Sequence, residues 1–225
     1  MTGRAGAGTG LPFHDRVAAG AALAEALDQY RARGALVLGL IRGGVPVAAE
    51  VARRLEAELD IVVVRKLGAP AAPELAMGAV TADGTRILNN DVVKELRVPD
   101  AQLVALTEAR GIEALRLEEQ LRRGRPDLRI RGRTVILVDD GLATGATMRA
   151  AVASVRRRVP GRIVVAVPVG SKEACAALRR EADEVVCPVE PEWFDAVGSW
   201  YEDFAQVSDR EVTDLLDRFP PRPAG

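Results

Sequence analysis

Two adjacent carboxylates, Asp139 and Asp140, stand between an apolar run and a loop of small residues. The run, residues 134–138, is rich in β-branched side chains and predicts a buried strand. The loop, residues 141–147, reads Gly-Leu-Ala-Thr-Gly-Ala-Thr, and a helical pattern begins within it. A loop that leads into a helix offers backbone N–H groups, a positive dipole end and, here, two threonine hydroxyls. These groups are suited to binding a phosphate.

Carboxylates beside a phosphate loop repel a bound phosphate unless a neutral or cationic group lies between them. A ribose 5-phosphate meets this condition, because its 2- and 3-hydroxyls can donate to the acids while its phosphate occupies the loop. A Mg²⁺ ion nearby would relieve the remaining negative charge. The alternative is a strand that ends in solvated acids and an ordinary turn.

The sequence Val-Asp-Asp-Gly-Leu-Ala-Thr-Gly-Ala-Thr resembles the signature of the type I phosphoribosyltransferases, which use phosphoribosyl pyrophosphate (PRPP). It is most similar to the adenine and competence-associated types. The resemblance implies that Asp139 and Asp140 hold the ribose hydroxyls. It also implies Mg²⁺ as the cofactor, held mainly by PRPP oxygens and waters, with Asp139 as a candidate ligand. The residues implied for the 5-phosphate are Ala143, Thr144, Gly145, Ala146 and Thr147.

A second glycine loop, Arg42-Gly43-Gly44, follows a predicted strand at residues 35–41. The glycines allow the backbone to approach a ligand closely, and the forked arginine cation suits phosphate oxygens. The alternative is a tight turn with a surface arginine. The loop resembles the pyrophosphate-binding loop of the family, in which a strained or cis peptide is common.

Residues 65–70, Arg-Lys-Leu-Gly-Ala-Pro, resemble a segment that opens a mobile loop in the adenine-type enzymes, with one residue fewer before the proline. Lys66 is therefore a predicted charge partner of the pyrophosphate, the alternative being a solvated lysine. Residues 69–78 are rich in Ala, Pro and Gly, which suits a lid or hood that orders on substrate binding, the alternative being a plain surface loop. Glu74, the one acid in this stretch, is a hypothetical general base.

Aromatic residues gather at positions 190–204 in a chain otherwise poor in them. Trp193 and Phe194 could stack on a flat acceptor, and the segment resembles the Pro-x-x-Phe piece that covers the base in purine-type members. The alternative is a small core cluster beneath a C-terminal helix.

The implied reaction is transfer of the 5-phosphoribosyl group from Mg-PRPP to a small nitrogenous acceptor with release of pyrophosphate. The 6-oxopurine enzymes of the family carry an aspartate at the position of Ala143, so guanine and hypoxanthine are disfavoured acceptors. A non-catalytic protein that binds PRPP or a nucleotide for regulation is the alternative. The sequence lacks a Gly-x-x-x-x-Gly-Lys-Ser/Thr loop, which excludes P-loop chemistry.

Alternating strand and helix patterns predict an α/β fold with a doubly wound, mainly parallel sheet and helices on both faces. We expect one phosphoribosyltransferase-like domain at residues 13–219, between tails at 1–12 and 220–225. A lid and an inserted helical segment are expected at about 66–130, and an aromatic hood at about 188–206.

The composition of the chain disfavours several classes of binding partner. The net charge is −1, and the six arginines within 122–133 lack interleaved aromatics, so nucleic-acid binding is disfavoured and these side chains are expected to be solvated. The chain has no apolar run of roughly 18 residues and no signal-peptide pattern, which predicts a cytoplasmic protein without membrane contact.

Cys175 and Cys187 are expected to be reduced core residues, and a transition-metal site is disfavoured. The family analogy implies a homodimer.

Overall fold

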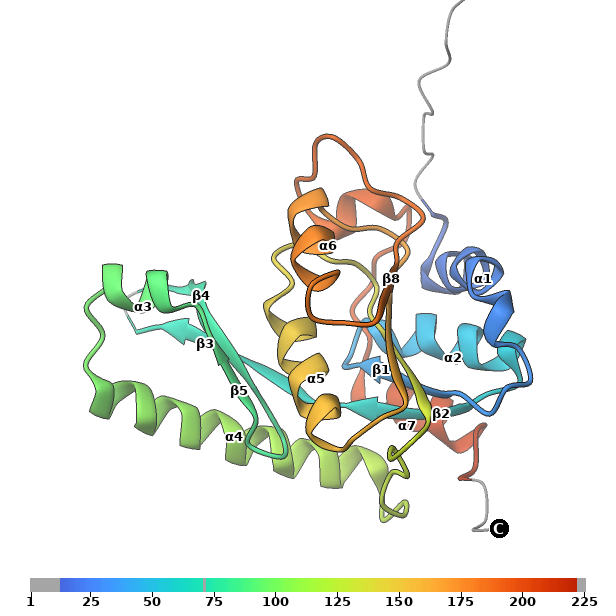
Figure 1. Cartoon of the computed structure of the whole chain (residues 1–225), viewed down its shortest axis with the longest axis horizontal. Coiled ribbons are helices and arrows are strands. Elements are labelled where there is room, and N and C mark those ends of the chain that lie inside the picture. Colours follow the sequence, from blue (N-terminus) through green and yellow to red (C-terminus); the bar gives the residue numbers. More distant parts are fainter. Residues whose placement is uncertain (1–12, 71, 222–225) are drawn as a thin grey trace, which may run out of the picture.

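The centre of the fold is a five-stranded parallel sheet in the order β2-β1-β6-β7-β8 (Figure 1). The computed structural model describes residues 13–70 and 72–221. The strands of this sheet are β1 (Leu36–Leu40), β2 (Glu58–Val62), β6 (Thr134–Val138), β7 (Arg162–Ala166) and β8 (Glu184–Val186). Because parallel strands are buried on both faces, they read as continuous apolar runs, as the sequence predicted.

Alternate residues of the strands enter two separate hydrophobic clusters. Val37 and Ile136 face one cluster, while Leu38 and Leu137 face the other. The first is covered by α1 (Arg16–Ala26), α2 (Gly44–Leu55) and α7 (Asp209–Asp217), and the second by α5 (Ala146–Arg157) and α6 (Lys172–Leu178). Helices on both faces of a parallel sheet confirm the predicted fold class (Figure 1).

A smaller antiparallel sheet, which we call the hood sheet, extends from the end of β2 (Figure 1). It comprises β3 (Val64–Ala69), β4 (Ala72–Thr81) and β5 (Arg86–Leu88), followed by α3 (Asn90–Glu95) and α4 (Asp100–Arg122). Two short 3₁₀ turns, η1 (Asp28–Tyr30) and η2 (Val197–Trp200), complete the described elements.

Much of the segment 69–78, predicted as a lid or hood, is strand β4 of the hood sheet, so the alternative of a plain surface loop was wrong. Its small residues have a packing role, because a Cβ at Gly78 would lie 2.2 Å from the carbonyl oxygen of Ile87 in β5. The composition therefore permits close strand pairing, which the sequence pattern alone did not distinguish from a loop.

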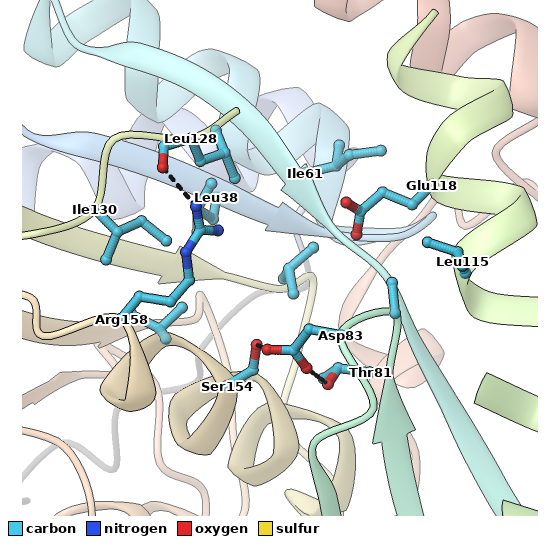
Figure 2. A pocket seen from close by; sticks show the side chains of 13 residues that line it. Leu38, Ile61, Thr81, Asp83, Leu115, Glu118, Leu128, Ile130, Ser154 and Arg158 are labelled. Atoms are coloured by element: carbon cyan, nitrogen blue, oxygen red, sulfur yellow. Dashed lines mark hydrogen bonds between the residues drawn. The ribbon is translucent and has the colours of Figure 1, made fainter. Parts of the chain in front are cut away.

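The turn between β4 and β5 is fastened to α5 through Asp83 (Figure 2). The Asp83 carboxylate accepts hydrogen bonds from Thr81 Oγ1 at 2.5 Å, Thr85 N at 2.9 Å and Ser154 Oγ at 2.8 Å. Burial alone would raise the pKa of Asp83, but these bonds outweigh it and hold the pKa below its usual value. A cavity of about 240 Å³ separates this turn from α4, where burial raises the pKa of Glu118.

A buried ion-pair cluster joins β2 to the end of α4. Asp60 accepts from Nε of Arg122 at 3.0 Å and from Nε of Arg125 at 3.3 Å, and its side chain is 4% exposed. The expectation that the arginines of 122–133 are solvated was wrong for these two, whose side chains are 11% exposed. Their partner lies more than 60 residues earlier, so local sequence could not identify it.

No described helix combines the length and apolar character that crossing a bilayer requires.

Replacing Asp60 by Asn should lower the free energy of unfolding by about 3 kcal/mol, because it leaves two buried guanidinium groups without a carboxylate. Urea unfolding followed by circular dichroism measures this change. The matched control is Glu113→Gln, which removes the acid of an exposed pair with Arg110 and should cost less than about 0.5 kcal/mol. Equal costs for the two variants would refute the structural role of Asp60.

Candidate active site

Two of the predicted loops meet at one edge of the central sheet. β1 and β6 are adjacent and parallel, with Gly39 opposite Val138, so the segments that leave their carboxyl ends start side by side. One segment contains Arg42, Gly43 and Gly44, and the other begins with Asp139 and Asp140. Ligands of open α/β sheets bind at this edge.

Glycine is required at the contact between these loops. A Cβ at Gly43 would lie 2.0 Å from Oδ2 of Asp140, and one at Gly44 would lie 2.7 Å from the carbonyl oxygen of Val138. Gly44 is the first residue of α2, so the N-terminal N–H groups of this helix lie beside the acids. The peptide bond between Ile41 and Arg42 is cis.

The two carboxylates are partly buried and close together. The backbone N–H of Asp140 donates to Oδ1 of Asp139 at 2.9 Å. Burial raises the pKa of Asp139 well above its ordinary value, and the neighbouring Asp140 carboxylate raises it further. Burial also raises the pKa of Asp140, although the Arg16 guanidinium opposes that shift. The edge of the sheet therefore holds concentrated negative charge that favours a cationic or hydroxyl-bearing ligand.

Arg16 is a site residue that sequence reasoning missed. Its Nε donates to Oδ2 of Asp140 at 2.9 Å, and its Nη1 donates to the carbonyl oxygen of Ala205 at 2.7 Å. The guanidinium carbon lies 3.9 Å from the ring centroid of Phe204, a cation–π contact. Arg16 is 124 residues from Asp140 in the chain. The local pattern around Arg16, at the start of an ordinary amphipathic helix, gave no signal of this partner.

The predicted phosphate loop leads directly into α5. Gly145 has φ +76° and precedes Ala146, the first helical residue. Because the first turn of a helix leaves N–H groups without intrahelical acceptors, this end can bind an anion. Ala143 and Thr144 are exposed, and Ser171 Oγ holds the loop by donating to the carbonyl oxygen of Ala143 at 2.7 Å.

The segment after η2 packs against the acids from the opposite end of the chain. The Tyr201 hydroxyl donates to the carbonyl oxygen of Asp140 at 2.5 Å. A Cβ at Gly141 would lie 2.5 Å from Cγ1 of Val197. Tyr201 also stacks at a tilt with Phe13 and Phe204, so part of the aromatic segment forms a small cluster that supports the site.

The structure does not bring every predicted site residue to this edge. Lys66 is exposed on β3 of the hood sheet. The backbone of Glu74 belongs to β4, but its side chain lies outside the described residues. Arg42 is at the edge, with its Nε donating to Oδ1 of Asp209 at 2.5 Å. Phe194 is partly buried, whereas Trp193 is 90% exposed and its ring faces solvent.

The donor set at this edge fits Mg²⁺ in its chemistry. Mg²⁺ prefers oxygen ligands, and one or two carboxylates beside substrate phosphates are a common arrangement. Asp140 already has a cationic partner in Arg16. Asp139 is therefore the carboxylate whose charge is less compensated, and it is the residue that would hold the ion.

Comparison with known proteins finds a family match and similar chains. The phosphoribosyl transferase domain family matches residues 13–204. A Mycobacterium tuberculosis H37Rv protein named "Putative phosphoribosyl transferase Rv0571c" is 48% identical over 206 residues, which is 92% of this chain and 46% of that protein. The chain thus spans about half the length of the curated relatives it matches.

Solved structures extend the likeness to the fold. The crystal structure of TT1426 from Thermus thermophilus has a TM-score of 0.80 and 45% identity, covering 94% of this chain and 100% of that one. A hypothetical protein from Neisseria gonorrhoeae, solved with bound ppGpp, has a TM-score of 0.52 and 15% identity over 92% of this chain and 96% of its own. This second likeness concerns the fold alone.

Replacing Asp139 by Asn should raise the melting temperature of the ligand-free protein at pH 8. A carboxyl whose folded-state pKa is raised contributes stability below its unfolded pKa, and that contribution is lost as the pH rises through the folded pKa. Ionised Asp139 therefore destabilises the fold near neutral pH, and neutral Asn removes the cost. Each 1 kcal/mol gained corresponds to about 2–4 °C. Differential scanning fluorimetry between pH 8 and pH 5 measures the effect.

The advantage of Asp139→Asn should shrink on acidification, because wild-type Asp139 takes up its proton. Asp127→Asn, at an exposed carboxylate, is the matched control and should melt like the wild type throughout. A variant less stable than the wild type at pH 8, or an advantage that grows toward pH 5, would contradict the assigned charge balance.

Proposed function

The chain belongs to the phosphoribosyl transferase domain family, and from this premise we propose that it transfers the 5-phosphoribosyl group of Mg-PRPP to a small nitrogenous acceptor. The observation that carries the proposal is the contact of the Gly43-Gly44 loop with the Asp139-Asp140 pair at one sheet edge. A phosphate loop starts at the same place. These three parts fit the pyrophosphate, the ribose and the 5-phosphate of one PRPP molecule.

In the proposed complex the acids bind the sugar. The ribose 2- and 3-hydroxyls donate to Asp139 and Asp140, while Thr144, Thr147 and the first N–H groups of α5 bind the 5-phosphate. Arg16 holds Oδ2 of Asp140 at 2.9 Å and so fixes the direction in which that carboxylate faces the sugar. Substrate orientation of this kind lowers the entropic part of the barrier.

The leaving group is bound by the neighbouring loop. The Gly43 and Gly44 amides and the Arg42 guanidinium would stabilise pyrophosphate, with Lys66 as a further charge partner if the hood sheet brings it near. Arg42 keeps a donor group for this purpose, since the bond to Asp209 uses only Nε. When bound, Mg²⁺ supplies positive charge to the pyrophosphate oxygens.

The chemical step is a substitution at C1 of the ribose. The bond from C1 to the pyrophosphate oxygen breaks with its electron pair, the acceptor nitrogen bonds to C1, and the acceptor proton leaves to a base or to solvent. Positive charge that grows on the ring in the transition state is stabilised by the fixed carboxylates of Asp139 and Asp140. Glu74 remains a hypothesis for the base, and Glu74→Gln tests it through the pH dependence of turnover.

The acceptor is a nitrogenous compound other than a 6-oxopurine. Ala143 is exposed in the phosphate loop and offers no carboxylate to such a base. Trp193, whose ring is exposed, stays a predicted stacking partner of a planar acceptor.

Pyrophosphate release from Mg-PRPP across a panel of bases and small amines tests the proposed activity. The double variant Asp139→Asn, Asp140→Asn should reduce release at least about 100-fold, because it removes the charges that bind the sugar and stabilise the transition state. Its circular dichroism spectrum should match the wild type. Asp127→Asn serves again as the exposed control. Wild-type release by the double variant, or no release by the wild type with any acceptor, would reject the proposal.

Trp193→Ala should raise KM for the acceptor about 2- to 12-fold, the range expected from losing one stacking contact of about 0.5–1.5 kcal/mol. Its KM for PRPP should stay unchanged, since the ring is assigned to the acceptor alone. Steady-state kinetics with each substrate varied in turn separates the two effects. Ile112→Ala, at an exposed residue of α4, is the control. Equal KM values for the acceptor in wild type and Trp193→Ala would remove Trp193 from the site.

A further inference from the structure

The only two cysteines of the chain face each other across two separate segments. Cys175 lies in α6, and Cys187 follows β8. Their Sγ atoms and a carboxylate oxygen of Glu190 all lie within 4.8 Å of one another. Gly170 makes room for both sulfurs, because a Cβ there would lie 2.9 Å from Sγ of Cys175 and 3.3 Å from Sγ of Cys187. We propose that Cys175, Cys187 and Glu190 bind one zinc-type divalent ion.

The ligand set selects the class of metal. Thiolates favour Zn²⁺ over Mg²⁺ and Ca²⁺, which prefer oxygen alone. Tetrahedral coordination with Zn–S bonds of about 2.3 Å places neighbouring ligand atoms about 3.8 Å apart. Since the three atoms lie within 4.8 Å of one another, they need to approach by at most about 1 Å, which side-chain rotation can supply. Three protein ligands leave a fourth position for water.

The charges around this cluster balance once an ion is bound. Binding breaks two S–H bonds, forms two Zn–S bonds and releases two protons to solvent. The two thiolates and the Glu190 carboxylate then carry three negative charges. These are balanced by the divalent ion and by the Arg179 guanidinium, whose Nη1 and Nη2 both donate to Glu190. Arg179 would hold the Glu190 carboxylate in position.

The ion would fasten α6 to the segment that follows β8. Ser171, the N-cap residue of α6, donates to the carbonyl oxygen of Ala143 in the phosphate loop. The segment beyond Glu190 carries Trp193. A metal at this position would therefore stabilise the residues that support the phosphate loop and the aromatic segment without contacting PRPP. The metal site does not depend on the proposed transferase activity.

Cobalt titration of the reduced full-length chain in degassed buffer tests the site. Co²⁺ bound by two thiolates gives a thiolate-to-metal charge-transfer band, and we expect it to saturate at one ion per chain and to disappear on addition of Zn²⁺. Cys187→Ser should weaken Zn²⁺ binding on the order of 100-fold, and Glu190→Gln about 10-fold. The matched control is Glu192→Gln, since Glu192 is 81% exposed and pairs with Lys172.

A thermal measurement makes the test independent of the spectroscopy. Saturating Zn²⁺ should raise the melting temperature of the wild type and of Glu192→Gln, but not that of Cys187→Ser, whose fold is checked by circular dichroism. Cys187→Ala should behave like Cys187→Ser. The proposal would be overturned if the reduced protein gave no charge-transfer band, or if Cys187→Ser took up as much metal as the wild type. It would also be overturned if the two thiols bound no metal and only formed a disulfide in air.

Discussion

Two neighbouring carboxylates at the end of the central strand β6 carry negative charge that the surrounding residues must compensate. Burial raises the pKa values of Asp139 and Asp140, and the Asp140 carboxylate raises the pKa of Asp139 further. The protein compensates part of this charge with the Arg16 guanidinium and the backbone N–H of Asp140. The charge that remains uncompensated destabilises the ligand-free protein.

Residues from distant parts of the chain contact the acid pair. Arg16 comes from the first helix, the glycine contact from the loop after β1, and Tyr201 from the segment after η2. Arg42 is held by Asp209 at the start of α7. The C-terminal elements therefore support the back of the site, while Ala143 and Thr144 in the loop before α5 are exposed.

Local composition left the structure open in one place and misled the prediction in another, for the same reason. The small residues of 69–78 were compatible with a plain surface loop as well as with a hood, and it is the close pairing of β4 and β5 at Gly78 that decides for the hood sheet. The arginines after α4 indicated a solvated surface, but Arg122 and Arg125 bind Asp60, and Arg125 also donates to the carbonyl oxygen of Phe219. Each case depends on a partner distant in sequence, and no local pattern records such a partner.

The sequence by itself determined the parallel sheet, the acid pair and the two glycine loops, because periodicity and loop chemistry are local properties that survive in any correct fold. Only the tertiary structure decided that Arg16 neutralises Asp140 and that Trp193 is exposed while Tyr201 is buried. It also brought the two cysteines together. These contacts follow from strand order and helix packing, which bring residues that are far apart in the chain within bonding distance. The local sequence around each residue cannot specify such a partner.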